Sequence, residues 1–188
     1  MTKTKKKSNG NSFLGTLAAL IILCVVLTIV SDKFLTYNNL MSVLKQTTFT
    51  ALLSTGMLLC LITAGIDLSV GANATFCACI CGMLVKGGMT NSLVLIVIAI
   101  VAGTLIGLIN GLLLTRLHLP HPFVSTLGMK NFLWGASLLV VSSQMVSGFP
   151  DGVMALGSAT IGGFPVSFIV VVVIYVIMHI LLTRTSLG

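Results

Sequence analysis

Long apolar runs separated by short polar stretches make up most of this sequence. An apolar helix needs about 20 residues to cross the hydrocarbon of a bilayer, with a range of about 17 to 25. Six runs reach or approach that length, after a polar tail over 1–12. They predict spans at 13–30, 47–64, 68–85, 92–115, 123–141 and 164–182. The pattern therefore predicts an all-α, polytopic membrane protein with one transmembrane domain over 13–188.

Two stretches between these runs are too polar to span a membrane. In Thr36–Gln46, Leu40 and Val43 lie on an apolar face opposite a polar one, which predicts an interfacial helix or a tilted entry to the second span. The stretch 142–163 is rich in Gly and Ser and contains Pro150. It predicts an external loop with room for a short helix.

Composition supports lipid rather than water as the solvent of this chain. Hydrophobic residues make up 56%, and there are ten Lys and Arg against three Asp and no Glu. A soluble domain carries about a quarter charged residues. The net charge of +7 does not indicate nucleic-acid binding, because four of the basic residues lie in the tail and the others, apart from Lys130, lie near the ends of apolar runs.

The placement of basic residues predicts a cytoplasmic N-terminus in a bacterial inner membrane. With six spans, Arg116 and Arg184 fall on the cytoplasmic side, whereas Lys33, Lys45 and Lys86 fall on the other. The first run also resembles the core of a secretory signal peptide, but the further runs and the lack of a clear small-residue cleavage site favour a retained span.

The sequence offers no catalytic or cofactor motif. It contains no G-x-x-x-x-G-K-[ST] phosphate loop, no HExxH and no Ser/His/Asp set placed for hydrolysis. Cys77, Cys79 and Cys81 invite a metal interpretation, but on a helix only Cys77 and Cys81 share a face. We interpret them as small apolar residues of a span. We expect that the chain is not an enzyme and that it binds no cofactor or metal ion.

Glycines recur every four residues in the fourth predicted span and form one stripe, which lets a neighbouring backbone approach closely. Asn110 lies on the same side and is placed to hydrogen-bond across that contact. The third span carries a similar small-residue stripe. The predicted helix-packing residues are Gly71, Gly82, Gly103, Gly107, Gly111 and Asn110.

Charged groups at membrane depth are the candidates for function. Asp67, between two glycines, is predicted to cap the third span by accepting from N–H groups near Ser69, with a direct role in a substrate pathway as the alternative. Lys130 lies about two turns into the fifth span, where it either extends toward the headgroups or lines a wet cavity. The candidate pathway residues are Asp67, Ser69, Asn73, Lys130 and Asn131.

Three short strings occur along the chain in this order: TYNNL at Thr36–Leu40, GIDLSVG at Gly65–Gly71 and PFVSTLGM at Pro122–Met129. Together they closely resemble the ribose-type permease family of ATP-binding-cassette importers. The resemblance implies a fold of the vitamin-B12-importer type (type II), half or more of which this chain would supply. It also implies a second permease copy, an ATPase subunit, an external sugar-binding protein and a monosaccharide as the substrate.

Two departures from the family pattern stand out. Members commonly carry Arg before a Gly in the fifth span, where this chain has Trp134-Gly135, and Lys130, one turn earlier, is our candidate for the missing charge. Members are also longer, so we expect a partial chain that stops at the start of the coupling loop. A chain of this length also fits a stand-alone vitamin-binding subunit of an energy-coupling-factor-type importer, or a membrane assembly factor.

Overall fold

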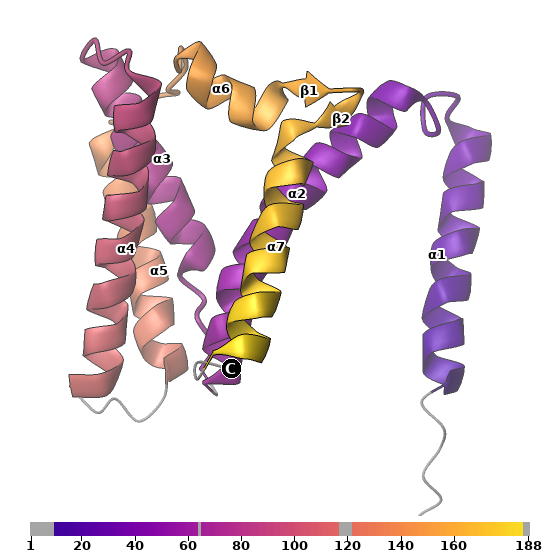
Figure 1. Ribbon diagram of the computed structural model, residues 1–188, viewed down its shortest axis with the longest axis horizontal. Coiled ribbons are helices and arrows are strands. Elements are labelled where there is room, and N and C mark those ends of the chain that lie inside the picture. The colour runs from indigo at the N-terminus through magenta and orange to yellow at the C-terminus, as the bar shows by residue number, and fades with distance from the viewer. Residues whose placement is uncertain (1–9, 64, 117–121, 186–188) are drawn as a thin grey trace, which may run out of the picture. The chain divides into compact units, whose positions relative to one another are not determined.

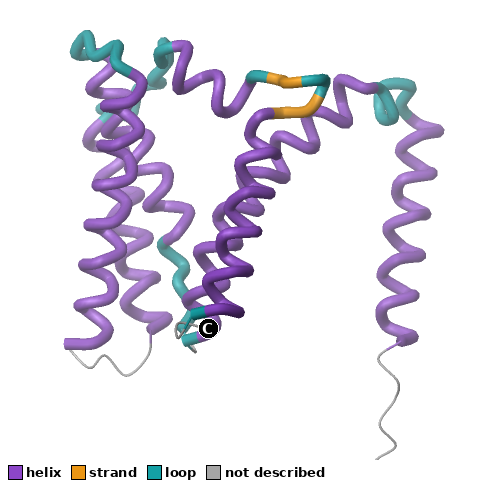
Figure 2. The backbone as a smooth tube through the Cα atoms, in the orientation of Figure 1, coloured by secondary structure: helices purple, strands orange, loops and turns teal. Residues whose placement is uncertain are grey.

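The computed structural model describes residues 10–63, 65–116 and 122–185, so the predicted tail over 1–12 lies mostly outside it. Helices make up nearly all of the described chain (Figures 1 and 2). The elements are α1 (Gly10–Val30), α2 (Tyr37–Ile62), α3 (Val70–Lys86), α4 (Ser92–Arg116), α5 (Pro122–Val140), α6 (Asp151–Ser158), β1 (Thr160–Ile161), β2 (Phe164–Pro165) and α7 (Val166–Arg184). The described part of the chain is all-α apart from the small β1–β2 hairpin.

Each of the six predicted runs contains a helix. The largest difference is in α2, which begins at Tyr37 rather than near residue 47. The polar stretch Thr36–Gln46 is therefore the first part of α2 and continues into the apolar part without a break. The Asn39 side-chain amide donates to the Phe34 carbonyl (2.7 Å) and so fixes the entry to this helix.

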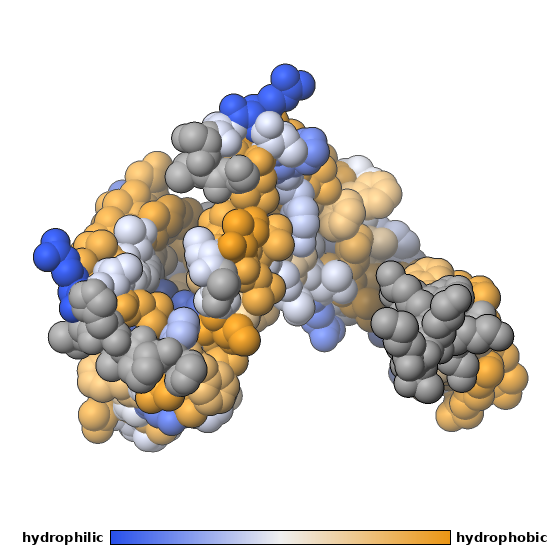
Figure 3. Space-filling model, turned by 90° about the horizontal axis from the view of Figure 1, so that it is seen from below, coloured by the Kyte–Doolittle hydropathy of each residue, from blue (hydrophilic) through white to orange (hydrophobic). Residues whose placement is uncertain are grey.

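Among the described residues, three helices are long and apolar enough to cross a membrane: α1 over Phe13–Val30, α4 and α7. Helices α2 and α5, also predicted as spans, do not reach that criterion, so their crossing stays a prediction. The apolar α3 is shorter, at 17 residues. Large hydrophobic side chains are exposed along all three long helices, and hydrophobic residues cover most of the face seen in Figure 3. Such a surface is stable in lipid, where it does not contact water.

Contacts divide the chain into two units, Met1–Val43 and Leu44–Gly188. Within the described part of the first unit, α1 is followed by a tight turn in which the Phe34 N–H donates to the Ser31 carbonyl (3.0 Å). All of the residues that carry the candidate sites below belong to the second unit.

In the second unit, α3 packs against both α4 and α5 (Figure 1). Ala72 and Cys77 from α3, Ile106 from α4 and Leu133 from α5 form its buried cluster. The small side chains on α3 allow this close approach.

The stretch 142–163, predicted as an external loop with room for a short helix, contains the short helix α6 and the start of the hairpin. Gly162 and Gly163 have φ angles of 57° and 86°, as a two-residue turn of twisted strands requires. Helix α6 contacts α4 and α7. It lies at the end of the unit where α3 stops and α4 begins (Figure 1).

Candidate functional site

A chain of polar side chains joins the segment before α3 to α4. The Asp67 Oδ1 atom accepts from the Ser69 backbone N–H (2.7 Å) and from the Ser69 hydroxyl (2.6 Å). The same hydroxyl oxygen accepts from the Asn110 Nδ2 atom (2.7 Å). Ser69 and Asn110 are only 1% and 4% exposed, so this network is shielded from solvent.

The carboxylate sets the direction of every bond in this network. An ionised carboxylate can only accept, so the Ser69 hydroxyl must donate to Asp67 and accept from the Asn110 amide. The Asn110 Oδ1 atom therefore points away from Ser69. It is buried and has no hydrogen-bond partner in the described part of the chain. A buried amide oxygen in this state still needs a donor.

The segment Gly65–Ser69 is recessed from the helix ends beside it. Its partner Asn110 lies six residues, or about 9 Å, before the end of α4 at Arg116. The Thr126 hydroxyl, about 6 Å inside the start of α5, shares its one proton between the Ile66 carbonyl and the Pro122 carbonyl of its own helix, each at 3.1 Å. The 17 residues of α3 give it a length of about 26 Å, short of the about 30 Å of a bilayer core.

The capping prediction for Asp67 requires a correction. The N-cap position of α3 is occupied by Ser69, and that residue makes no capping bond of its own because its hydroxyl bonds to Asp67. Asp67 accepts from the Ser69 N–H, as predicted, but it does so as an Asx turn before the helix. Its carboxylate thus fixes the residue at which α3 starts.

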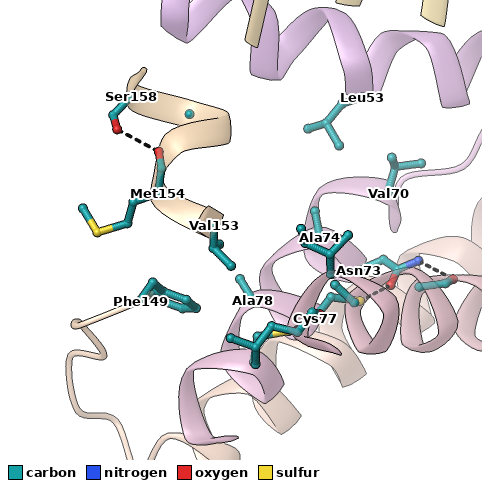
Figure 4. A pocket seen from close by; sticks show the side chains of 16 residues that line it. Leu53, Val70, Asn73, Ala74, Cys77, Ala78, Phe149, Val153, Met154 and Ser158 are labelled. Carbon is teal, nitrogen blue, oxygen red and sulfur yellow. Dashed lines mark hydrogen bonds between the residues drawn. The ribbon is translucent and has the colours of Figure 1, made fainter. Parts of the chain in front are cut away.

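Asn73 lies one turn further along α3 and connects to α4 independently. Its Nδ2 atom donates to the Gly103 carbonyl (3.1 Å), and its Oδ1 atom accepts from the Cys77 thiol (3.4 Å). Asn73 also lines a cavity of about 820 Å³ between α2, α3, α4 and α6 (Figure 4). Asp67 and Ser69 do not line this cavity.

Lys130 and Asn131 are not joined to these groups. Lys130 is half-buried and Asn131 exposed on α5, and no hydrogen bond or ion pair links either of them to another described residue. Neither residue lines the 820 Å³ cavity. Trp134, where the family commonly has Arg, is 61% exposed.

The predicted packing glycines differ in their surroundings. A Cβ atom at Gly82 would lie 2.4 Å from the Val146 Cγ1 atom, and one at Gly103 would lie 3.6 Å from the Cys77 Sγ atom. At Gly71, Gly107 and Gly111 an added Cβ would meet no described atom within 4 Å. The role of those three in helix packing stays a prediction.

Sequence reasoning did not single out Thr126, which holds the recessed segment from α5. It lies in the PFVSTLGM string. The signal available in the sequence was a residue with a hydroxyl group inside a predicted apolar span. Cys77 and Cys81 share the buried face of α3, as expected, and Cys81 donates to the Leu95 carbonyl (3.4 Å). The described residues contain no group of three side chains suited to a metal ion.

Comparison with known proteins identifies relatives along the whole chain. The family model described as "Branched-chain amino acid transport system / permease component" matches residues 39–188. The chain is 30% identical over 188 residues to the D-allose transport system permease protein of Escherichia coli K12, covering 98% of this chain and 57% of that protein. It is 33% identical over 178 residues to the ribose import permease protein of Bacillus subtilis 168, covering 93% and 54%.

A third relative, the fructose import permease protein of Bifidobacterium longum, is 28% identical over 207 residues, covering 98% of this chain and 58% of that protein. The chain spans about half the length of the curated relatives it matches. No solved structure matches it. Because the family model matches residues 39–188 and the relatives align with nearly all of the chain, this chain belongs to the family of permease components of branched-chain amino acid transport systems.

Proposed function

We propose that this chain is part of the membrane-spanning permease subunit of an ATP-binding-cassette importer for a monosaccharide. The observation that carries the proposal is the identity of its relatives: proteins named for allose, ribose and fructose import align with nearly all of the chain. The family match favours this function over the vitamin-binding subunit.

The proposal includes the fold and topology that the resemblance implies. The chain would supply six crossings of a type II permease in the bacterial inner membrane, with a cytoplasmic N-terminus. Its partners would be an ATPase subunit, a second permease copy and an external sugar-binding protein. A partner ATPase is needed because the sequence has no phosphate-binding loop of its own.

Asp67, Ser69 and Asn73 remain our candidates for the substrate pathway, together with Lys130 and Asn131. Support comes from the recessed segment, because irregular backbone at membrane depth is stable only where protein buries it or where it lines a water-filled path. A carboxylate at that depth is a pointer to function.

The test is purification through an affinity tag on this chain from membranes of its own organism. We expect an ATPase subunit to co-purify, and its ATP hydrolysis to rise when ribose, allose or fructose is supplied with the external binding protein. Leucine is the matched control, because the family description names branched-chain amino acids. Stimulation by leucine alone would reassign the substrate, and a bound vitamin with no ATPase would contradict the proposal.

A further inference from the structure

The cavity of about 820 Å³ offers few hydrogen bonds to an occupant. Most of its lining is aliphatic or aromatic, including Leu53, Val70 and Phe149 (Figure 4). Its few polar side chains are already bonded inside the protein. Asn73 bonds Gly103 and Cys77, the Cys81 thiol donates to the Leu95 carbonyl, and the Ser158 hydroxyl donates to the Met154 carbonyl.

A polar occupant would therefore lose more hydrogen bonds to water than this wall could replace. That penalty applies to each hydroxyl group of a sugar. A buried water needs two to four polar partners, which this wall does not supply. The chemistry of the wall selects a hydrocarbon.

A positive charge lies beside one residue of this wall. The Lys45 ammonium of α2 donates to the carbonyl of Ser158, the last residue of α6, at 2.9 Å. An ammonium has three donors, so two remain. Within the described ranges no carboxylate lies at ion-pair distance from Lys45. The apolar cavity thus has an uncompensated cation at the edge where α6 ends.

We propose that this cavity binds an anionic phospholipid, with an acyl chain against α3 and α4 and the phosphate against Lys45. A cation beside an apolar pocket attracts an acidic headgroup through its charge, on either side of the membrane. An apolar protein helix would also fit the wall, but it would leave the Lys45 ammonium without an anion. One lipid molecule satisfies both the apolar wall and the Lys45 ammonium. The proposal does not depend on which substrate the permease moves.

Native mass spectrometry of the purified chain tests the headgroup. The probes are phosphatidylglycerol and phosphatidylcholine with identical acyl chains. We expect one phosphatidylglycerol to be retained about fivefold more than phosphatidylcholine, because a single exposed ion pair at about 4 Å contributes about that factor. Lys45→Ala should abolish the preference. Lys86→Ala is the control, because that ammonium bonds Gln144 (3.4 Å) and should leave the preference unchanged.

A second pair of variants tests the acyl site. Ala74→Phe should fill the cavity and remove the retained lipid, whereas Thr75→Phe, on an exposed position of the same helix, should not. Circular dichroism shows whether each variant keeps its helices. Equal retention of both lipids, a preference that survives Lys45→Ala, or retention that survives Ala74→Phe in a folded protein would overturn the proposal. A photo-crosslinker at position 78 that captures a polypeptide instead of lipid would do the same.

Discussion

At the scale of single residues, one oxygen atom of Asp67 positions Ser69 directly and Asn110 through Ser69. The Asp67 Oδ1 atom takes both the N–H and the hydroxyl of Ser69, and that hydroxyl in turn receives the Asn110 amide. Interhelical hydrogen bonds in membranes contribute modestly, because the unfolded chain in lipid also finds partners. We expect the network to determine geometry more than stability.

The Asn110–Ser69 bond should therefore give a small but measurable coupling. In a double-mutant cycle of Asn110→Ala and Ser69→Ala, we expect about 0.6 kcal/mol and at most about 1.7 kcal/mol. Unfolding free energies in detergent micelles measure it. Thr104→Ala is the control partner, because its hydroxyl bonds only within α4, to the Ile100 carbonyl. Zero coupling for Asn110 and Ser69 would show that this bond does not form.

Substitutions at Asp67 separate its geometric role from its charge. Asp67→Asn keeps an Oδ1 acceptor for Ser69, so we expect little loss of stability, whereas Asp67→Ala removes both hydrogen bonds to Ser69 and should cost about 0.5–1.5 kcal/mol for each. Thermal stability and uptake by the assembled importer are the two readouts. If Asp67→Ala is as stable as the parent while both variants abolish uptake, the charge serves the substrate pathway instead.

At the scale of elements, the glycines of α3 and α4 show that one sequence pattern covers different surroundings. Gly82 is buried against Val146, and Gly103 lies in ordinary contact with Cys77. Gly107, one turn after Gly103 on the same stripe, has open space around it in the described structure. A four-residue repeat therefore identifies a face of a helix, whereas the contact on that face depends on the neighbour.

Alanine at these glycines should have opposite effects. Gly82→Ala should destabilise by about 1–3 kcal/mol, because its Cβ would overlap the Val146 side chain, and adding Val146→Ala should restore most of the loss. Gly107→Ala should be neutral or stabilise by up to about 1 kcal/mol through helix propensity. Thermal unfolding in detergent compares the variants. A destabilised Gly107→Ala would show that another helix packs there.

At the scale of the whole molecule, the surface is the dominant feature. Long helices expose large hydrophobic side chains on most sides, so their stability depends on lipid as solvent. An apolar exterior of this extent is the reverse of the surface of a water-soluble domain.

The proposed topology predicts which positions reach the outer medium. In a variant whose native cysteines are replaced by alanine, a cysteine at position 147 should react with a membrane-impermeant maleimide in intact spheroplasts. A cysteine at position 116 should react only after permeabilisation, because the end of α4 is assigned to the cytoplasm. Ser147 and Arg116 are both exposed, so access alone does not separate them. The reverse labelling pattern would refute the proposed orientation.

The sequence alone determined the helices, because run length and apolarity measure the fit of a helix to a bilayer. Helices occur in all six predicted segments. The start of α2 was predicted too late, because the polar residues after Tyr37 form a helix that continues directly into the apolar run. The sequence also marked Asp67 and Asn110 as unusual, each on its own helix.

Only the tertiary structure showed that these two residues share Ser69, 41 positions from Asn110 along the chain, and that Thr126 holds the same segment from α5. It also placed the Lys45 ammonium against the carbonyl of Ser158 in α6, although 113 positions separate the two residues. The physical reason is that hydropathy and periodicity are local properties of the chain. A hydrogen bond between helices depends on their rotation and depth, and these are fixed only when the helices pack.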